Sequence, residues 1–223
     1  LFREKAPGAV RVFNGFGKST GLMQLQELGM IETPIILSNT LAVGTAFTVL
    51  AEEALAACGE IGRGAGTVNP LVLECNDGLL SDIRALAVTP EHVRRALEDA
   101  RWRQGQEETE AAGEEHTDAP RRGQAPAEGG LGAGAGMCCY GLKGGIGGAS
   151  RIAETGGRAF TVGALALTNF GRIEDLQVCG QPLGAAWARL LPEDPPERGS
   201  VAVLLATDAP LSSKRGARRP GSW

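Results

Sequence analysis

The sequence changes character abruptly at the peptide bond between Gly199 and Ser200. Residues 191–198 hold three prolines and three acidic residues, a composition typical of an exposed loop. Residues 201–206 are all apolar, which predicts a buried β-strand. A chain can be cut in such a loop without disturbing a packed core. Any fold of this chain must therefore start a buried strand directly after an exposed segment, with a serine at the junction.

The composition predicts one domain, residues 1–223. A chain of 223 residues with 43% hydrophobic content can bury one sizeable core. The net charge of -4 gives no sign of the basic face that phosphate contacts require, so nucleic acid is not an expected partner. No stretch approaches about 18 uninterrupted apolar residues, so no membrane partner is expected either.

Five cysteines are an odd number, and their spacing is not that of a disulfide framework. They favour a reducing compartment and hence the cytoplasm. The periplasm is the alternative, because the chain begins at Leu1 rather than at a methionine and an export signal would lie upstream. Cys138 and Cys139 are neighbours in a predicted strand and point to opposite faces, so no metal site is predicted.

The apolar pattern predicts strands at 34–37, 71–73, 137–142, 160–168 and 201–206. It predicts one helix over 41–57, capped by Ser38 or Asn39, and a second that begins at Thr89. Glycines dominate residues 129–148 and indicate tight turns around the strand at 137–142. Residues 103–128 are rich in acidic side chains and poor in large apolar ones, which predicts a mobile surface loop.

Only two histidines are present, His92 in the second predicted helix and His116 in the acidic segment. Both positions are expected to be exposed, so neither a Ser-His-Asp triad nor a histidine-based zinc site is expected. A serine hydrolase built from this chain would need another base.

An ordered set of motifs resembles one known family. The motifs are Asn-Gly-Phe-Gly-Lys at 14–18, Glu-Thr-Pro-Ile at 32–35, Asn-Thr-Leu at 39–41, the segment 69–78, the glycine-rich segment 132–151 and the segment 197–210. In this order they closely resemble the DmpA-type aminopeptidases, also called the P1 family or peptidase family S58, which include the beta-peptidyl aminopeptidases.

The resemblance implies the α+β fold that these peptidases share with ornithine acetyltransferases, a sandwich of two central sheets flanked by helices. It also implies a serine aminopeptidase that releases N-terminal residues from short peptides, amides or esters through an acyl-enzyme on Ser200. The enzyme would use no cofactor and would assemble as a homo-oligomer, often a tetramer. Self-cleavage between Gly199 and Ser200 would give the fragments 1–199 and 200–223.

Cleavage before Ser200 would supply the missing base. A freed α-amino group has a pKa of ~7.7 to 8.0 and can accept the proton of the serine hydroxyl near neutral pH. Gly199 would leave the carbonyl that is attacked unobstructed. The alternative is a serine that merely begins a strand, and the resemblance favours the nucleophile.

Asn169 matches the position where the family has an oxyanion-hole asparagine, and the alternative is a turn-forming residue before Gly171. Glu74, Asn76, Asp77 and Asn14 are the predicted substrate-binding residues, with Glu74 matched to the substrate's free amino group. An Asn-Asp-Gly turn explains residues 76–78 equally well. A family residue near position 79 supplies a polar contact that Leu79 cannot, so a second oxyanion donor is not identified.

Members of the family continue well beyond the segment that ends this chain at Trp223. The sequence therefore predicts a chain truncated at both ends. Two alternatives to the aminopeptidase stay open. One is an omega-amide oligomer hydrolase of the same superfamily, which differs in its substrate alone. The other is a catalytically inactive fragment that at most binds a partner.

Overall fold

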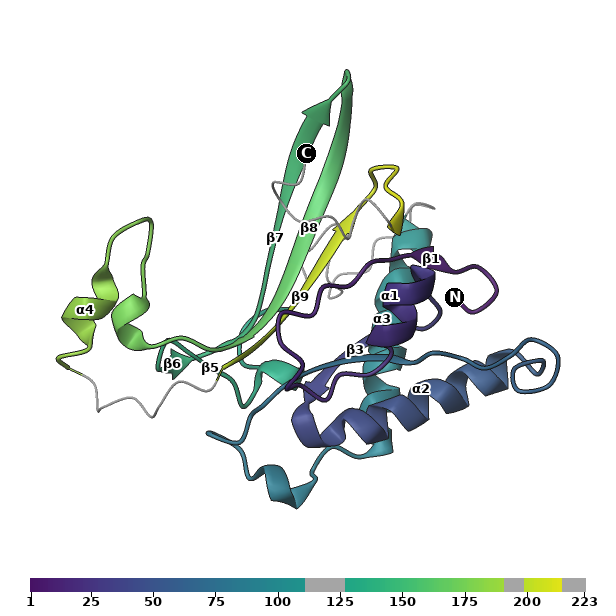
Figure 1. The fold of residues 1–223 in the computed structure, drawn as a ribbon, viewed down its shortest axis with the longest axis horizontal. Coiled ribbons are helices and arrows are strands. Elements are labelled where there is room, and N and C mark those ends of the chain that lie inside the picture. Colours follow the sequence, from purple (N-terminus) through teal and green to yellow (C-terminus); the bar gives the residue numbers. More distant parts are fainter. Residues whose placement is uncertain (111–126, 191–198, 214–223) are drawn as a thin grey trace.

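The computed structural model describes residues 1–110, 127–190 and 199–213 (Figure 1). In chain order its elements are β1 (Ala6–Pro7), α1 (Leu22–Leu28), β2 (Met30–Ile31), β3 (Ile35–Asn39), η1 (Thr40–Ala42), α2 (Val43–Ala57), β4 (Leu71–Cys75), η2 (Ile83–Ala85), α3 (Pro90–Glu110), η3 (Gly132–Gly134), β5 (Cys138–Cys139), β6 (Leu142–Lys143), β7 (Gly145–Thr155), β8 (Arg158–Asn169), η4 (Ile173–Asp175), α4 (Leu183–Trp187) and β9 (Ser200–Thr207). The predicted α+β class is confirmed.

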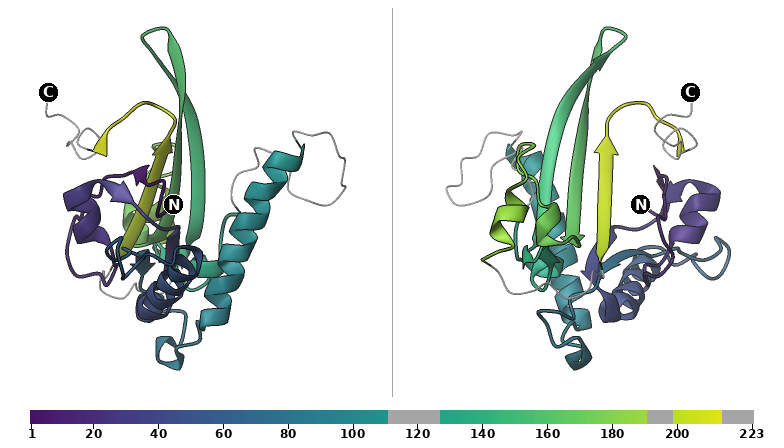
Figure 2. Two further views of the ribbon diagram at one scale, coloured as in Figure 1. Left: turned by 90° about the vertical axis from the view of Figure 1, so that its right-hand side faces the viewer. Right: turned by 60° about the vertical axis from the view of Figure 1, so that its left-hand side comes forward.

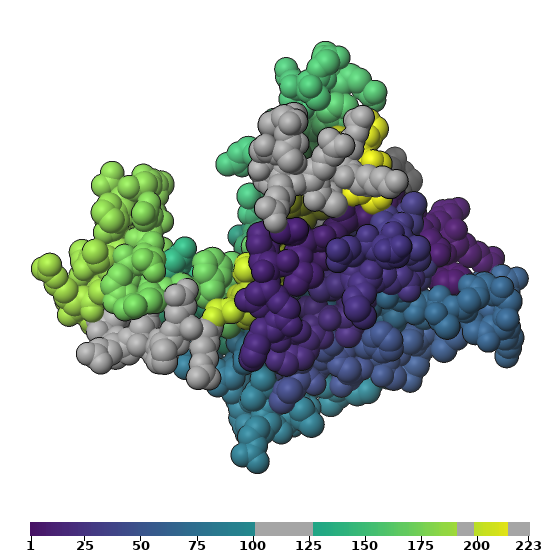
Figure 3. Space-filling view, viewed as in Figure 1, coloured from purple at the N-terminus to yellow at the C-terminus, as the bar shows by residue number. Residues whose placement is uncertain are grey.

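The first sheet is a parallel pair, β3 and β4, with Ile35 opposite Leu71 and Asn39 opposite Cys75. The one-turn η1 joins β3 to helix α2, and the Asn39 side chain caps this turn by accepting a hydrogen bond from the Ala42 amide. The predicted start of the helical segment 41–57 and its Asn39 cap are confirmed. The space-filling view shows the N-terminal residues, in purple, beside the blue surface of α2 (Figure 3).

Helices α2 and α3 cover one face of the β3–β4 pair. Their buried side chains form one apolar cluster with Val72 of β4; its members are Val43, Ala46, Val49, Leu50, Val72, Val93 and Leu97. Because side chains alternate along a strand, Val72 and Glu74 point to this helix-covered face and Cys75 points to the opposite one. The strand therefore separates Glu74 from Cys75 although they are adjacent in sequence.

The second sheet is antiparallel, in the order β7-β8-β9. Strands β7 and β8 form a long hairpin, which rises above the rest of the molecule in Figure 1. Gly156 and Gly157 make its two-residue turn with φ values of 57° and 74°, the left-handed conformation that such a turn requires. Strand β9 lies along β8, with Leu205 opposite Ala164 and Ser200 opposite Asn169 (Figure 2).

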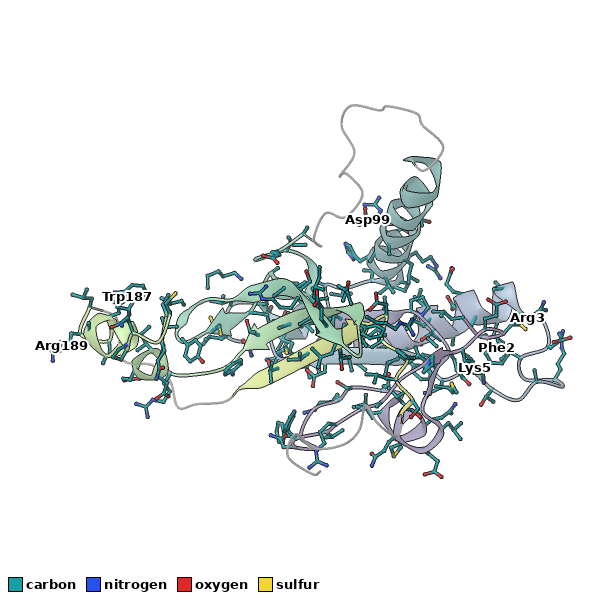
Figure 4. The ribbon with its side chains drawn as sticks, turned by 90° about the horizontal axis from the view of Figure 1, so that it is seen from above. Phe2, Arg3, Lys5, Asp99, Trp187 and Arg189 are labelled. Atoms are coloured by element: carbon teal, nitrogen blue, oxygen red, sulfur yellow. The ribbon has the colours of Figure 1, made fainter. Side chains whose placement is uncertain are left out.

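The two sheets pack together through a second apolar cluster of Cys75, Met137 and Leu167, all fully buried. This arrangement agrees with the expected pair of central sheets. Among the described residues the helices cover the β3–β4 side, whereas Val201, Val203 and Leu205 on β9 are 49%, 54% and 74% exposed. Seen from above, Trp187 and Arg189 of the α4 region lie at one end of the molecule, and Phe2, Arg3 and Lys5 lie at the other (Figure 4).

Several expectations about individual segments were wrong. The strand expected to be buried over 201–206 forms within β9, but none of its residues is buried, because β9 is the edge strand of its sheet among the described residues. The acidic loop does not begin at residue 103, because α3 continues to Glu110 through glutamine, glutamate and arginine residues that favour helix. Residues 111–126 of that predicted loop lie outside the described residues. The strand expected over 137–142 is instead a tight hairpin of β5 and β6. Strand β7, which begins at Gly145, was not predicted because glycine is depleted in strands.

One described helical segment, Thr40–Ala57, is long and apolar enough to cross a membrane, with a mean hydropathy of 1.3. Core helices of globular proteins meet the same criterion. Val49 and Leu50 of this segment are each 1% exposed and belong to the core against β4. These side chains anchor the segment in the core of the fold.

Candidate active site

Ser200 and Asn169 lie opposite each other where β9 begins and β8 ends. The Asn169 side-chain nitrogen Nδ2 donates a hydrogen bond to Ser200 Oγ over 3.2 Å. The chain leaves β8 immediately afterwards through Gly171, whose φ of 90° suits glycine. The sheet register thus brings together the two residues that the sequence predicted as catalytic, Ser200 and Asn169.

A backbone amide completes the surroundings of the Ser200 oxygen. The N–H of Asn76, just beyond the end of β4, donates to Ser200 Oγ over 3.1 Å. Asn169 Nδ2 also donates to the Asn76 carbonyl over 2.7 Å, which ties β8 to this segment. The Asn76 side chain accepts from the Gly78 amide over 2.9 Å and so forms the Asn-Asp-Gly turn of the alternative interpretation. The contact with Ser200 therefore comes from the backbone of Asn76.

The orientation of the Asn169 carboxamide is fixed from its other side. The backbone N–H of Cys138 donates to Asn169 Oδ1 over 3.0 Å. Since an N–H can only donate, this bond assigns the oxygen to the Cys138 side and the Nδ2 donor to the Ser200 side. Asn169 is only 9% exposed. Its side chain is thus held against Ser200 by three hydrogen bonds rather than used to form a turn.

Gly199 lies where no side chain fits. A Cβ at this position would be 2.6 Å from Phe170 Cβ, closer than real Cβ atoms approach other atoms, and 3.1 Å from Phe170 Cα, which is a tight contact. Phe170 follows Asn169 directly, so any residue larger than glycine would press on the segment that carries the Asn169 carboxamide. Glycine at 199 keeps the peptide bond before Ser200 close to this pair.

Glu74 is 8% exposed and its carboxylate is held by the N-terminal segment. Its Oε1 accepts from the Lys18 amide over 2.8 Å, and its Oε2 accepts from the Thr40 hydroxyl. The Glu74 amide in turn donates to Ser19 Oγ over 3.2 Å. The carboxylate lies on the helix-covered side of β4, and within the described part of the chain its hydrogen bonds go to Lys18 and Thr40 rather than to Ser200 or Asn169.

The other two predicted substrate residues lie in separate surroundings. Asp77 is 8% exposed; its Oδ2 accepts from Asn39 over 3.1 Å, and its buried Oδ1 has no hydrogen-bond partner in the described part of the chain. Asn14 is exposed, and its side chain accepts from the Phe16 amide over 3.0 Å within its own loop. The structure therefore does not gather Asn14, Glu74 and Asp77 around Ser200 as a single cluster.

Cys75 is a neighbour of Ser200 that sequence reasoning did not single out. The thiol is fully buried and lies 3.6 Å from the Leu167 carbonyl, to which it donates. Burial raises the pKa of Cys75, and a side-chain hydrogen bond with Ser200 offsets part of that effect. Cys75 therefore lies as a neutral thiol beneath the serine. Its position at the end of a predicted strand carried no signal of this contact.

A metal-binding cluster of three or more His, Cys, Asp or Glu side chains does not occur among the described residues. His92 lies in the first turn of α3, where its ring nitrogen Nδ1 accepts a hydrogen bond from the Thr89 amide over 3.1 Å.

A hollow of about 570 Å³ lies on the glycine- and alanine-rich face of β7 and β8 and is rimmed by Glu128 and Lys143. Its lining includes neither Ser200 nor Asn169, so it is distinct from the serine site.

Comparison with known proteins identifies the family. The profile of peptidase family S58 matches residues 1–219, so the chain belongs to peptidase family S58. The predicted family is thereby confirmed.

The chain is 34% identical over 212 residues to the beta-peptidyl aminopeptidase BapA of Sphingosinicella microcystinivorans, a match covering 89% of this chain and 47% of that protein. Among solved structures, the PH0078 protein of Pyrococcus horikoshii OT3 superposes with a TM-score of 0.79 at 43% identity, covering 96% of this chain and 53% of the other. The L-aminopeptidase D-Ala-esterase/amidase of Ochrobactrum anthropi, described as a variant of the Ntn hydrolase fold, gives 0.73 at 31%, covering 95% and 52%. The chain thus spans about half the length of these relatives.

Proposed function

We propose that this chain is the self-processing part of a serine aminopeptidase or amidase that releases N-terminal residues from short peptides, amides or esters through an acyl-enzyme on Ser200. The observation that carries the proposal is the convergence of two donors, Asn169 Nδ2 at 3.2 Å and the Asn76 amide at 3.1 Å, on Ser200 Oγ. Membership of family S58 and the similarity to aminopeptidases support the same reaction class.

Processing would begin with attack of Ser200 Oγ on the Gly199 carbonyl carbon. The C–N bond before Ser200 breaks, the hydroxyl proton passes to the leaving nitrogen, and an ester links Gly199 to the serine oxygen. Water then hydrolyses this ester to give the Gly199 carboxylate and a free Ser200 with its own α-amino group. The tight packing of Gly199 on Phe170 supports this step, because it keeps the reacting peptide beside Asn169.

In the processed enzyme the α-amino group of Ser200 would accept the hydroxyl proton as Oγ attacks the substrate carbonyl. Asn169 and the Asn76 amide would donate to the negative charge that develops on the substrate oxygen. Leu79, which is 62% exposed, can donate no side-chain hydrogen bond. The Asn76 amide is therefore our proposal for the second oxyanion donor.

Glu74 would bind the free amino group of the substrate. Each of its carboxylate oxygens accepts one hydrogen bond from the protein, which leaves acceptor capacity for an ammonium group. Its anchoring by Thr40 and Lys18 would keep the carboxylate in one orientation. Homo-oligomers, tetramers by resemblance, remain part of the proposal.

An omega-amide oligomer hydrolase would use the same chemistry and differ only in its substrate. An inactive fragment is the second candidate, and one observation favours it. The outward side chains of β9 are 49% to 74% exposed at Val201, Val203 and Leu205, directly after the proposed nucleophile. Exposed apolar surface of this kind accompanies loss of a packing partner.

Intact-mass analysis of the purified chain tests the proposal. We expect two fragments, residues 1–199 and the 24-residue peptide 200–223, and a single unbroken chain for Ser200→Ala. Ser150→Ala, an exposed serine on β7, is the matched control and should split as the unmodified chain does. A Ser200→Ala variant that still splits at this bond would exclude the serine as nucleophile. An unmodified chain that stays whole would favour the inactive fragment.

A further inference from the structure

Lys143 forms the far end of a hydrogen-bonded chain that reaches Ser200. Its side-chain nitrogen Nζ donates to three backbone carbonyls: Gly134 over 2.9 Å, Met137 over 3.3 Å and Gly144 over 2.7 Å. Three carbonyl oxygens around one ammonium satisfy all of its donors. The processing and hydrolysis steps proposed above do not use this residue.

The β5–β6 hairpin explains why Lys143 lies there. Its two-residue turn has positive φ at both positions, 53° at Tyr140 and 69° at Gly141, and places Lys143 directly opposite Cys138. The next residue, Gly144, passes so close that a Cβ would lie 3.0 Å from the carbonyl carbon of Cys138 and 2.9 Å from the Thr168 carbonyl oxygen. The hairpin therefore fixes Lys143 beside the backbone that precedes and follows Cys138.

The peptide group between Met137 and Cys138 links Lys143 to Asn169. Its carbonyl accepts from Lys143 Nζ over 3.3 Å and from the Gly144 amide over 2.8 Å, and its N–H donates to Asn169 Oδ1 over 3.0 Å. The Asn169 carboxamide then donates to Ser200 Oγ from its other side. Two amide groups thus connect the ammonium to the serine in series.

We propose that Lys143 is a positioning residue for this site: its ammonium polarises the Met137–Cys138 peptide, which strengthens the hydrogen bond to Asn169 and holds Asn169 Nδ2 toward Ser200. A positive charge at the carbonyl draws electron density from the amide, so the N–H becomes a stronger donor. Hydrogen bonds in series polarise one another in the same sense. The inference deepens the proposed function and rests on it.

The first test compares processing rates by intact mass. Lys143→Met keeps most of the aliphatic stem and removes the charge; we expect processing at Gly199–Ser200 to slow roughly tenfold. Lys143→Arg keeps the charge and should restore most of the rate. Arg151→Met is the matched control, because Arg151 is an exposed cation on β7 whose side chain bonds the Ser150 carbonyl; it should process as the unmodified chain does.

A double-mutant cycle separates positioning from a general effect on the fold. If Lys143 acts through Asn169, then Lys143→Met should cause no further loss in an Asn169→Ala chain. An equal further loss in that background, or unchanged processing in Lys143→Met alone, would overturn the inference.

Amide proton shifts provide a readout that needs no activity. In Lys143→Met the Cys138 amide proton and the Asn169 side-chain amide protons should move to lower chemical shift, whereas Arg151→Met should leave them in place. If the unmodified chain does not process, the proposed function fails, and these shifts still decide the inference. Unchanged shifts in Lys143→Met would refute it.

Discussion

Asn169→Ala is the change that tests the site most directly. It removes the donor to Ser200 Oγ, and it also removes the partners of the Cys138 amide and the Asn76 carbonyl. The substitution therefore has two separable effects, one on the rate of the reaction and one on the stability of the fold. The structure gives the expected size of each.

The rate effect follows from the loss of one of the two proposed oxyanion donors. Removal of such a donor lowers turnover by roughly two to three powers of ten. The stability effect follows from the loss of two hydrogen bonds, those from the Cys138 N–H to Asn169 Oδ1 and from Asn169 Nδ2 to the Asn76 carbonyl. Because Asn76 is exposed and Cys138 is half-buried, water can replace the lost partner, and each bond contributes about 0.5–1.5 kcal/mol to the free energy of unfolding.

The assay is the rate of processing at Gly199–Ser200 by intact mass, with a thermal melt of the same sample to show that the variant is folded. Asn69→Ala is the matched control, because the Asn69 carboxamide also donates to a backbone carbonyl, that of Gly21 over 3.0 Å, which belongs to a segment other than the Ser200 site. We expect the control to melt lower than the unmodified chain and to process at the normal rate.

A folded Asn169→Ala variant that processes as fast as the unmodified chain would refute the reasoning. Asn169 would then be a structural residue at the end of β8, and the 3.2 Å contact with Ser200 would carry no catalytic consequence. The same conclusion would follow if Asn169→Ala and Asn69→Ala lowered the melting temperature equally and processed at the same rate.

Three further outcomes are expected. Gly199→Ala should slow processing, since its Cβ would lie 2.6 Å from Phe170 Cβ, and an unchanged rate by intact mass would contradict the role of this packing. Glu74→Gln should raise KM for aminoacyl p-nitroanilides with little change in kcat, because the substrate ammonium loses a charged partner; an unchanged KM would remove Glu74 from the substrate site. Burial raises the pKa of Cys75, so above about pH 8.5 the unfolded chain loses a proton that the folded chain keeps, and the free energy of unfolding should fall as pH rises. Melts from about pH 7 to about pH 10 should show a smaller decline for Cys75→Ala, whereas exposed Cys179→Ala should match the unmodified chain.

Local patterns in the sequence predicted the elements that carry the site. The apolar run after Ser200 forms β9, α3 begins at Pro90 directly after Thr89, and Asn39 caps the turn into α2. These features are local, because a cap or an apolar run acts on residues next to it in the chain. The ordered motifs likewise predicted the family and named Ser200 and Asn169 as the candidate catalytic residues.

Contacts between distant backbone groups could not be predicted in this way. Asn76 and Ser200 are 124 residues apart, and the donor is an N–H that nearly every residue type carries. The alternation along β4 turned Glu74 and Cys75 to opposite faces, which residue type alone does not reveal. Gly145, Gly147 and Gly148 were part of a segment predicted to form turns, yet the tertiary structure pairs them with β8.

The sequence by itself therefore determined the family, several of the local elements, and the choice of Ser200 and Asn169 as candidate catalytic residues. Only the tertiary structure decided what surrounds them: the Asn76 amide, the Cys75 thiol and the Lys143 ammonium behind Asn169. The physical reason is that a hydrogen bond depends on position and direction within a few tenths of an ångström. Sheet register and hairpin geometry set those positions, and both arise from pairing between segments far apart in the chain.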